Sequence, residues 1–412
     1  MRRRIARTCS ALLAASVAGG CYLSHGFDRD DDAGETATCS GVADFHCVKR
    51  ESGACSALVE VPPECDLGEL VWRCPTASRV YRTATPEADC LPFHSPGGPL
   101  ARLGSGGITL ETGDGRCLWI LGDGVAPDGT VISHPAAVVP DDLPLGACPP
   151  GGSFLGGEHP VSVVDLADLG EGSLFSPGDS VRQGGRSWIF GRHWVLDAAS
   201  TFGVRKVGTK LGWFDDGADH VRFLEDYLWM ADADFGDSAL VVDDVPYVYG
   251  CYGEPHDLGY DCHLARADRG PVEQVSSYRY FAGAGGWSAD AAESVVVFQG
   301  GPHRSSVRYL PGRGRYVHVS IEGFGDHIDV SLSDRPDGPW SAPAALIGCR
   351  LPSDDPDALC GYPMLHPELS DPLAPSDIVV SYDVSTLAPD AEERRQANPD
   401  AYWPRLVRVT LP

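Results

Sequence analysis

The stretch that decides the fold reads Gly115-Arg116-Cys117-Leu118-Trp119-Ile120-Leu121-Gly122-Asp123, a turn followed by a strand-like core of aromatic and aliphatic residues. The chain repeats this pattern four more times. The later copies are Gly185–Gly191, Val245–Gly250, Gly314–Ser320 and Ser376–Tyr382. Their central residues, Trp119, Trp188, Tyr247, Tyr316 and Val379, are separated by 69, 59, 69 and 63 residues. A sustained period of this kind is the sequence signature of a repeat architecture.

Each copy lies within a larger unit of alternating polar and apolar residues. The copies are preceded by further short strand patterns at Ile108–Leu110, Ser180–Arg182, Ser238–Val242, Ser306–Tyr309 and the region around Leu369. Alternation continues after them, as in His263–Arg266 and His327–Leu332. Five such units, each a small antiparallel sheet, predict an all-β fold, a five-bladed β-propeller. A β-sandwich is the alternative, but a sandwich has no reason to repeat at this interval.

The N-terminus has the features of an export signal. Four arginines precede or enter an apolar run over Ile5–Val17, and small residues then lead to Cys21. The segment Val17-Ala18-Gly19-Gly20-Cys21 resembles the cleavage box of bacterial lipoproteins, although Ala18 stands where leucine is usual. That resemblance implies cleavage before Cys21 and lipidation of its sulfur. Tyr22 after that cysteine, rather than aspartate, resembles the signal for outer-membrane sorting. An ordinary signal peptide with an accidental cysteine is the alternative.

We predict four parts from these patterns. They are a signal peptide at 1–20, a polar tether at 21–38, a cysteine-rich module at 39–92 and the propeller at 93–412. The module is too short to build a large core, so we expect disulfides to hold it together.

The cysteines fit an oxidising compartment. The chain has 14 cysteines, and setting aside Cys9 in the signal and Cys21 leaves 12, an even number. Proximity in sequence predicts three disulfides, Cys117–Cys148, Cys251–Cys262 and Cys349–Cys360. The other six cysteines lie within residues 39–90, and their connectivity stays open. No paired CxxC or Cys/His spacing indicates a structural zinc site.

The charge excludes one class of partner. The chain has a net charge of −26, which becomes −30 once the four signal arginines are removed, and it contains only three lysines. Such a surface repels nucleic acid. We therefore expect no nucleic-acid partner, and a membrane partner only through the lipid at Cys21.

Several stretches within residues 100–385 resemble a bacterial family of five-bladed propellers of unknown function that includes endo-D-arabinanases. The match is closest over Ser305–Pro311 and on to Gly338-Pro339-Trp340-Ser341-Ala342-Pro343. It continues through Val245–Cys251 and Tyr280–Trp287. Asp334, Gly338 and Trp340 are also similar to the turn of the sialidase Asp-box, which is a structural device. The resemblance implies a substrate among extracellular polysaccharides.

Propeller topology predicts where the chemistry lies. The start of each blade's first strand and the end of its second strand meet at one mouth of the central funnel. Candidates at first-strand starts are Ser105, Asp179, Asp237, His303, Arg304, His366 and Glu368, and candidates near second-strand ends are Asp123, Glu322 and Asp383. Glycoside hydrolysis needs one protonated and one ionised carboxyl group. We therefore predict catalytic roles for Asp123, Glu368, Asp179 and Asp237, and substrate-binding roles for Ser105, Arg304, His303, His366 and Glu322.

One position departs from the resembling family. Its hydrolytic members pair an aspartate before the first strand with the aspartate of a Gly-Asp element. Asp123 matches the second, but counting back through the hairpin places Ser105 at the first. A serine cannot replace a carboxylate at neutral pH. Either a displaced carboxylate such as Glu111, Asp114 or Glu368 substitutes, or hydrolysis is impaired.

Two functions stay open at this point. One is an envelope-tethered glycoside hydrolase of endo-D-arabinanase type with an altered catalytic pair. The other is a non-catalytic propeller that binds glycan or protein. No motif indicates a cofactor or a metal site, although a calcium ion held across the blades in the funnel is an alternative.

Overall fold

The computed structural model describes residues 48–49, 55–56, 90–112, 117–139, 148–149, 153–200, 203–256, 259–300, 305–311, 313–321, 325–370 and 377–411. The predicted signal peptide, Cys21, the tether and nearly all of the cysteine-rich module lie outside these residues. So do His303, Arg304, Glu322 and Asp114. In the described part of the chain, no helix is both long and apolar enough to cross a membrane.

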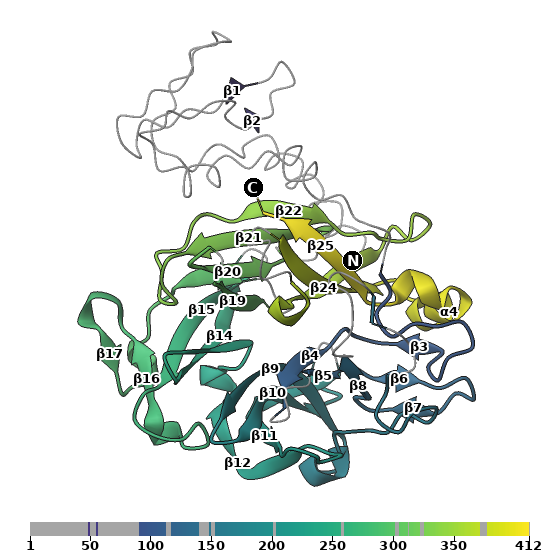
Figure 1. Cartoon of the computed structure of the whole chain (residues 1–412), viewed down its shortest axis with the longest axis horizontal. Coiled ribbons are helices and arrows are strands. Elements are labelled where there is room, and N and C mark those ends of the chain that lie inside the picture. Colours follow the sequence, from purple (N-terminus) through teal and green to yellow (C-terminus); the bar gives the residue numbers. More distant parts are fainter. Residues whose placement is uncertain are drawn as a thin grey trace.

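Five antiparallel sheets surround a common centre in chain order (Figure 1). Blade 1 contains β4 (Ile108–Glu111), β5 (Cys117–Ile120) and β8 (Ala136–Val139), beside a small sheet of β3 (Arg102–Leu103), β6 (Gly124–Val125) and β7 (Val131–Ile132). Blade 2 contains β9 (Ser173–Gln183), β10 (Arg186–Leu196), β11 (Val204–Phe214) and β12 (Arg222–Met230). Blade 3 contains β13 (Ser238–Val242), β14 (Val245–His256), β15 (Gly259–Ala267), β16 (Tyr278–Phe281), β17 (Trp287–Ser288) and β18 (Phe298–Gly300).

Blades 4 and 5 complete the ring. Blade 4 contains β19 (Ser306–Leu310), β20 (Arg315–Ser320), β21 (His327–Ser333) and β22 (Ala344–Gly348), and blade 5 contains β23 (Ala358–Leu365), β24 (Asp377–Thr386) and β25 (Arg405–Thr410). The helical elements are η3 (Leu166–Leu169), η4 (Ala231–Ala233), η5 (Val275–Ser277), η6 (Gly283–Gly285), η7 (Ala291–Glu293), η8 (Pro367–Leu369), α4 (Ala391–Ala397) and η9 (Pro399–Tyr402). A separate strand pair, β1 (Val48–Lys49) with β2 (Cys55–Ser56), lies in the N-terminal part. The predicted five-bladed propeller is confirmed.

The hydrophobic core is divided among the interfaces between blades. Each of five clusters of buried side chains, counted within the described residues, joins two neighbouring sheets. Trp119 of blade 1 packs with Val379 and Leu406 of blade 5, for example. Both faces of each sheet are therefore buried, which explains why the strand patterns contain runs of consecutive apolar residues as well as alternation.

One predicted strand is wrong. The first strand of blade 5 is β23, which ends at Leu365, whereas Leu369 lies in the single turn η8. Pro367 has no N–H to donate to a strand ladder, and this explains why the chain turns there.

The N-terminal end of the propeller closes the ring. The backbone N–H of Leu406 in β25 donates to the carbonyl oxygen of Cys90 at 2.9 Å, and the indole N–H of Trp403 donates to the carbonyl oxygen of Pro92 at 2.8 Å. Cys90 forms a disulfide with Cys148, and the N–H of Phe93 donates to the carbonyl oxygen of Pro149 at 2.8 Å. The segment 90–93 therefore fastens blade 5 to the long connection that follows β8 of blade 1.

Two of the three predicted disulfides are present, Cys251–Cys262 and Cys349–Cys360. The predicted Cys117–Cys148 bond is wrong, because Cys148 pairs with Cys90 and Cys117 is a free thiol. Cys117 begins β5, where it pairs with Glu111 of β4. Ring closure brings the distant Cys90 to Cys148, and proximity in sequence cannot reveal this.

We expect the double substitution Cys90→Ser/Cys148→Ser to lower the free energy of unfolding by about 4 kcal/mol, the chain-entropy value for a loop of this length. The sequence separation is 58 residues. Urea denaturation measures the effect. Cys117→Ser is the matched control and should change stability by less than about 1 kcal/mol. A larger loss for Cys117→Ser than for the double variant would contradict the observed pairing.

A buried histidine lies between blades 3 and 4. The His318 ring is 4.0 Å from that of Phe298 and 5.9 Å from that of Trp340, between centroids, and the residue is almost fully buried. Burial lowers the pKa of His318 from 6.5 to about 3. The folded protein therefore keeps this imidazole neutral at pH values where the unfolded chain binds a proton.

This difference predicts a loss of stability in acid. As the pH falls below about 6.5 only the unfolded chain gains a proton at His318, so this residue should lower the free energy of unfolding by about 2 kcal/mol between pH 7.5 and pH 5. His318→Phe keeps a ring among aromatic neighbours and removes the titration. Denaturation curves at both pH values should show the wild-type protein losing about 2 kcal/mol more than the variant. Equal losses would contradict the assignment.

Candidate functional site

The centre of the propeller holds a buried ion pair. Asp179 of β9 is fully buried, and it faces Arg308 of β19. Arg308 donates from Nη1 to Oδ2 at 2.6 Å and from Nη2 to Oδ1 at 2.8 Å. This is the bidentate geometry that makes guanidinium–carboxylate pairs strong. The pair joins blade 2 to blade 4.

Blade 3 contributes further donors to the same carboxylate. The Ser238 hydroxyl and the Ala239 N–H donate to Oδ2 of Asp179 at 3.0 and 2.8 Å, and the Ser180 N–H donates to Oδ1 at 2.8 Å. Burial alone would lower the pKa of Arg308, but the Asp179 carboxylate raises it overall. The Arg308 guanidinium is therefore charged at neutral pH, and both oxygens of Asp179 are occupied by protein donors.

Asp237 is occupied in the same way at the interface of blades 2 and 3. Arg192 of β10 donates from Nη2 to Oδ2 of Asp237 at 2.7 Å and from Nε to Oδ2 of Asp234 at 2.8 Å. The Cys251 N–H also donates to Asp237, at 2.7 Å, and Lys206 donates to Asp234 at 2.8 Å. Burial would raise the pKa of Asp234, but Arg192 and Lys206 together lower it. Both aspartates are buried.

His366 and Glu368 lie together between blades 5 and 1. Nδ1 of His366 is 2.9 Å from Oε1 of Glu368, Nε2 is 2.7 Å from the Ser381 hydroxyl, and the ring packs 4.3 Å from that of Trp119. A carboxylate only accepts, so Nδ1–H is the donor to Glu368. Burial would raise the pKa of Glu368, but His366 and then Arg308 lower it.

The predicted position of Glu368 needs correction. We expected Glu368 and His366 at the start of a first strand, but both follow the end of β23. Because first strands run parallel around the axis, Glu368 lies toward the end of the channel opposite the predicted mouth. Its side chain is 25% exposed.

Ser105, Asp123 and Asp383 meet at the predicted mouth. The Gly122 N–H donates to the carbonyl oxygen of Ser105 at 3.0 Å, so Ser105 lies beside the Gly122–Asp123 element. The Asp123 side chain is 54% exposed, with Oδ1 3.7 Å from Nδ1 of the buried His134. Oδ1 of Asp383, a nearly fully buried residue near the end of β24 in blade 5, accepts from the Gly106 N–H at 2.5 Å. A second carboxylate near Ser105, besides that of Asp123, therefore comes from another blade.

Metal binding finds no support in the described residues. No three His, Cys, Asp or Glu side chains converge there as metal ligands do. The calcium ion in the funnel therefore stays a prediction, and the described residues offer no group of ligands for it.

Sequence reasoning missed the arginines. Arg308 stands in an inner strand between small and apolar residues, in Ser306-Val307-Arg308, and Arg192 interrupts the aromatic run of β10. A charge in the interior of a core strand requires a buried partner. That signal could have indicated that two of the predicted catalytic aspartates form ion pairs.

Residues 197–386 match the family described as Domain of unknown function (DUF4185). The match runs from the end of β10 to the end of β24. It includes Arg308, Asp237, Glu368 and Asp383, whereas Ser105, Asp123 and Asp179 precede it. A search of curated proteins found no match to this sequence.

Solved structures resemble this chain in fold. A crystal structure described as that of a "putative hydrolase" from Bacteroides ovatus has a TM-score of 0.53 at 14% identity, covering 77% of this chain and 87% of that chain. The GH43_1 enzyme from Xanthomonas citri complexed with xylose has a TM-score of 0.46 at 12% identity, covering 81% and 92%. A GH43 β-xylosidase/α-arabinofuranosidase from a compost microbial metagenome gives 0.42 at 11%, covering 76% and 94%. At these identities the likeness concerns the fold.

We expect Asp179→Asn to lower the free energy of unfolding by about 3 kcal/mol, because it leaves the Arg308 guanidinium buried without its counter-ion. Chemical denaturation at neutral pH measures the loss. Asp123→Asn removes an exposed carboxylate and is the matched control, with an expected change below about 0.5 kcal/mol. Equal stability of the two variants would show that the ion pair does not hold the blades together.

Proposed function

We propose that this chain is an exported, envelope-tethered propeller that binds an extracellular polysaccharide without efficient hydrolysis. The observation that carries this proposal is the state of Asp179 and Asp237. Both are buried and both are held by an arginine. Neither carboxylate is available to a sugar.

The chemistry of glycoside hydrolysis explains why this matters. One carboxyl group must hold a proton for the leaving oxygen, and a second, ionised group must lie about 5 to 9.5 Å away. Both oxygens of Asp179 accept hydrogen bonds from Arg308 inside the protein, so Asp179 has no contact with the leaving oxygen of a substrate. Its full burial also keeps it from acting as base or nucleophile. Ser105 supplies only a hydroxyl at the mouth.

The groups that remain at the mouth suit binding. Asp123 offers an exposed carboxylate, and a sugar hydroxyl is a good donor to such a group. The Ser105 hydroxyl can both donate and accept. Polar side chains on a rigid ring are what recognition of a hydroxyl-rich ligand requires.

Weak hydrolysis is a second candidate, and one contact favours it. Asp383 is nearly fully buried, and its Oδ1 accepts from the N–H of Gly106, directly after Ser105, so a second carboxylate lies beneath the side of the mouth that holds Asp123. In this version of the proposal Asp123 and Asp383 form the altered catalytic pair of an endo-D-arabinanase-type enzyme. Glu368 does not fit the role because it follows the far end of its strand.

The location of the protein is part of the proposal. Three disulfides within the described residues support folding in an oxidising compartment. The basic and apolar N-terminal run and the small residues before Cys21 support export and lipidation. We propose a lipid anchor at Cys21 in the bacterial envelope, in the outer membrane, with a cell-wall or extracellular glycan as partner.

Binding and turnover can be measured on the same samples. We expect the purified protein to bind an arabinan or another envelope polysaccharide, with no release of reducing ends. Asp123→Asn should weaken binding about tenfold, because it removes a charged acceptor. Asp215→Asn, on the outer part of blade 2, is the control and should bind normally.

Two results would change this conclusion. Reducing-end release that disappears in both Asp123→Asn and Asp383→Asn would establish the hydrolase instead. Failure to bind any envelope polysaccharide would overturn the glycan proposal.

A further inference from the structure

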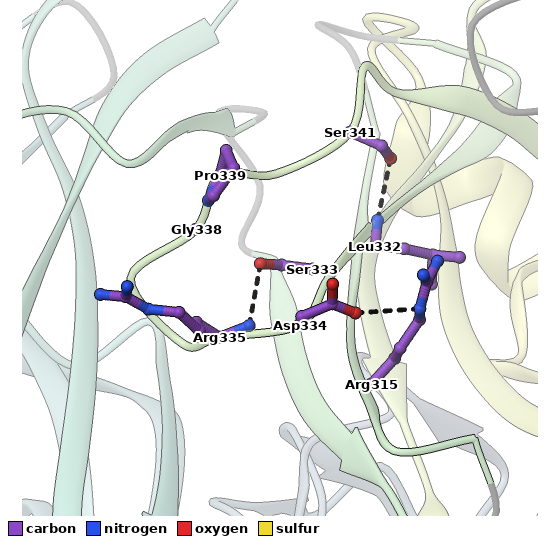
Figure 2. Close-up of a pocket in the computed structure, with 8 residues that line it drawn as sticks. All are labelled: Arg315, Leu332, Ser333, Asp334, Arg335, Gly338, Pro339 and Ser341. Carbon is purple, nitrogen blue, oxygen red and sulfur yellow. Dashed lines mark hydrogen bonds and ion pairs between the residues drawn. The ribbon is translucent and has the colours of Figure 1, made fainter. Parts of the chain in front are cut away.

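A small pocket lined by both polar and apolar groups lies on blade 4, away from the funnel mouth. It has a volume of about 130 Å³ and is enclosed by the turn that joins β21 to β22 (Figure 2). Its walls are Arg315, Leu332, Ser333, Asp334, Arg335, Gly338, Pro339 and Ser341. Arg315 begins β20 and Ser333 ends β21, so the pocket opens on the face where first strands end. The mouth with Ser105 and Asp123 is on the opposite face.

The turn between β21 and β22 is held together by hydrogen bonds that do not involve Arg315 or Asp334. The Ser341 hydroxyl accepts from the Leu332 N–H at 3.0 Å, and the Ser333 hydroxyl accepts from the Arg335 N–H at 3.1 Å. Arg335 also donates to Asp337 at 2.9 Å, and in Figure 2 its side chain extends away from Arg315.

Packing holds the rest of the turn. The Trp340 ring lies 5.3 Å from that of Phe298, between centroids, and the Tyr249 hydroxyl donates to the carbonyl oxygen of Pro336 at 2.6 Å. These contacts fasten the turn to blade 3. The turn therefore does not need Arg315 or Asp334 to keep its shape.

Arg315 and Asp334 meet at the side of the pocket. Nε of Arg315 is 3.0 Å from Oδ1 of Asp334, and their side chains are 22% and 73% exposed. This contact uses one of five guanidinium donors and one of about four carboxylate lone pairs. An exposed pair of this kind adds little to stability. Donors and acceptors thus remain for a ligand.

The chemistry of the pocket selects an uncharged ligand with neighbouring hydroxyl groups. Arg315 is paired with Asp334 and Arg335 with Asp337, so the pocket has no net charge that would favour an ion of either sign. A hydroxyl group can donate to the carboxylate and accept from the guanidinium at once. Leu332 and Pro339 add apolar wall against which C–H groups can pack. The volume corresponds to about four water molecules, which suits one edge of a sugar ring.

We propose that this pocket is a second glycan-binding subsite, which holds one neutral sugar residue by adjacent hydroxyl groups between Arg315 and Asp334. The inference rests on the proposed function, because it assumes that the funnel ligand is also a glycan. It adds that the chain has two separated binding points on opposite faces. Two low-affinity sites that bind the same polymer chain raise the overall affinity without any new contact.

Isothermal titration calorimetry of the full chain with the neutral probe arabinotriose tests this proposal. The wild-type protein should bind two molecules per chain. Asp334→Asn and Arg315→Gln should each reduce this to one, with at least tenfold weaker binding at the lost site. Asp123→Asn should remove the other molecule. The matched control is Asp215→Asn, because Oδ1 of Asp215 contacts Nε of Arg186 at 2.8 Å in the same geometry.

The outcomes separate the two proposals. Unchanged binding by Asp334→Asn and Arg315→Gln, with loss in Asp123→Asn, would overturn the second subsite and leave the funnel function standing. Tighter binding of trigalacturonate than of arabinotriose at the pocket would overturn the neutral class. Absence of any saccharide binding would overturn both. Asp334 is largely exposed, so unfolding midpoints of its variant should equal the wild-type value.

Discussion

A carboxylate without access to water must find its partners inside the protein, and Asp179 of blade 2 finds them in blades 3 and 4. Arg308 of blade 4 donates two hydrogen bonds to it, and Ser238 and Ala239 of blade 3 donate one each. Replacing either charge alone leaves the other buried and unpaired. The relative position of blades 2, 3 and 4 around the axis therefore depends on one interaction, and the Arg192 network with Asp234 and Asp237 repeats the same solution between blades 2 and 3.

The opposite side of the ring is closed by different means. Blades 5 and 1 are joined by the disulfide between Cys90 and Cys148, by the packing of Trp119 against His366, and by the contact between Asp383 and Gly106. Fastening the first and last blades keeps the faces of both sheets covered by their neighbours. For a chain with a net charge of −26, covalent closure also counters the mutual repulsion of surface carboxylates.

The same constraints shape function. The buried carboxylates that join the blades cannot contact a ligand. The polar groups that a ligand can reach are Asp123 and Ser105 at the mouth, and Arg315 and Asp334 on the opposite face. Both sets combine hydrogen-bond donors with acceptors, and both lie at or next to the ends of strands. This arrangement favours holding a hydroxyl-rich polymer over cleaving it.

The repeat of Trp119, Trp188, Tyr247, Tyr316 and Val379 is enough to predict five blades, and the local disulfides Cys251–Cys262 and Cys349–Cys360 follow from spacing, because partners 11 residues apart meet across one hairpin or loop. Asp179 and Arg308 are 129 residues apart, and only the closed ring brings them together. The same holds for Cys90 with Cys148, and for Glu368, whose end of the channel is fixed by the turn at Pro367. Local pattern and hairpin pairing are encoded in neighbouring residues. Which carboxylate is buried, paired or free is decided by tertiary structure, because burial and partners come from other blades.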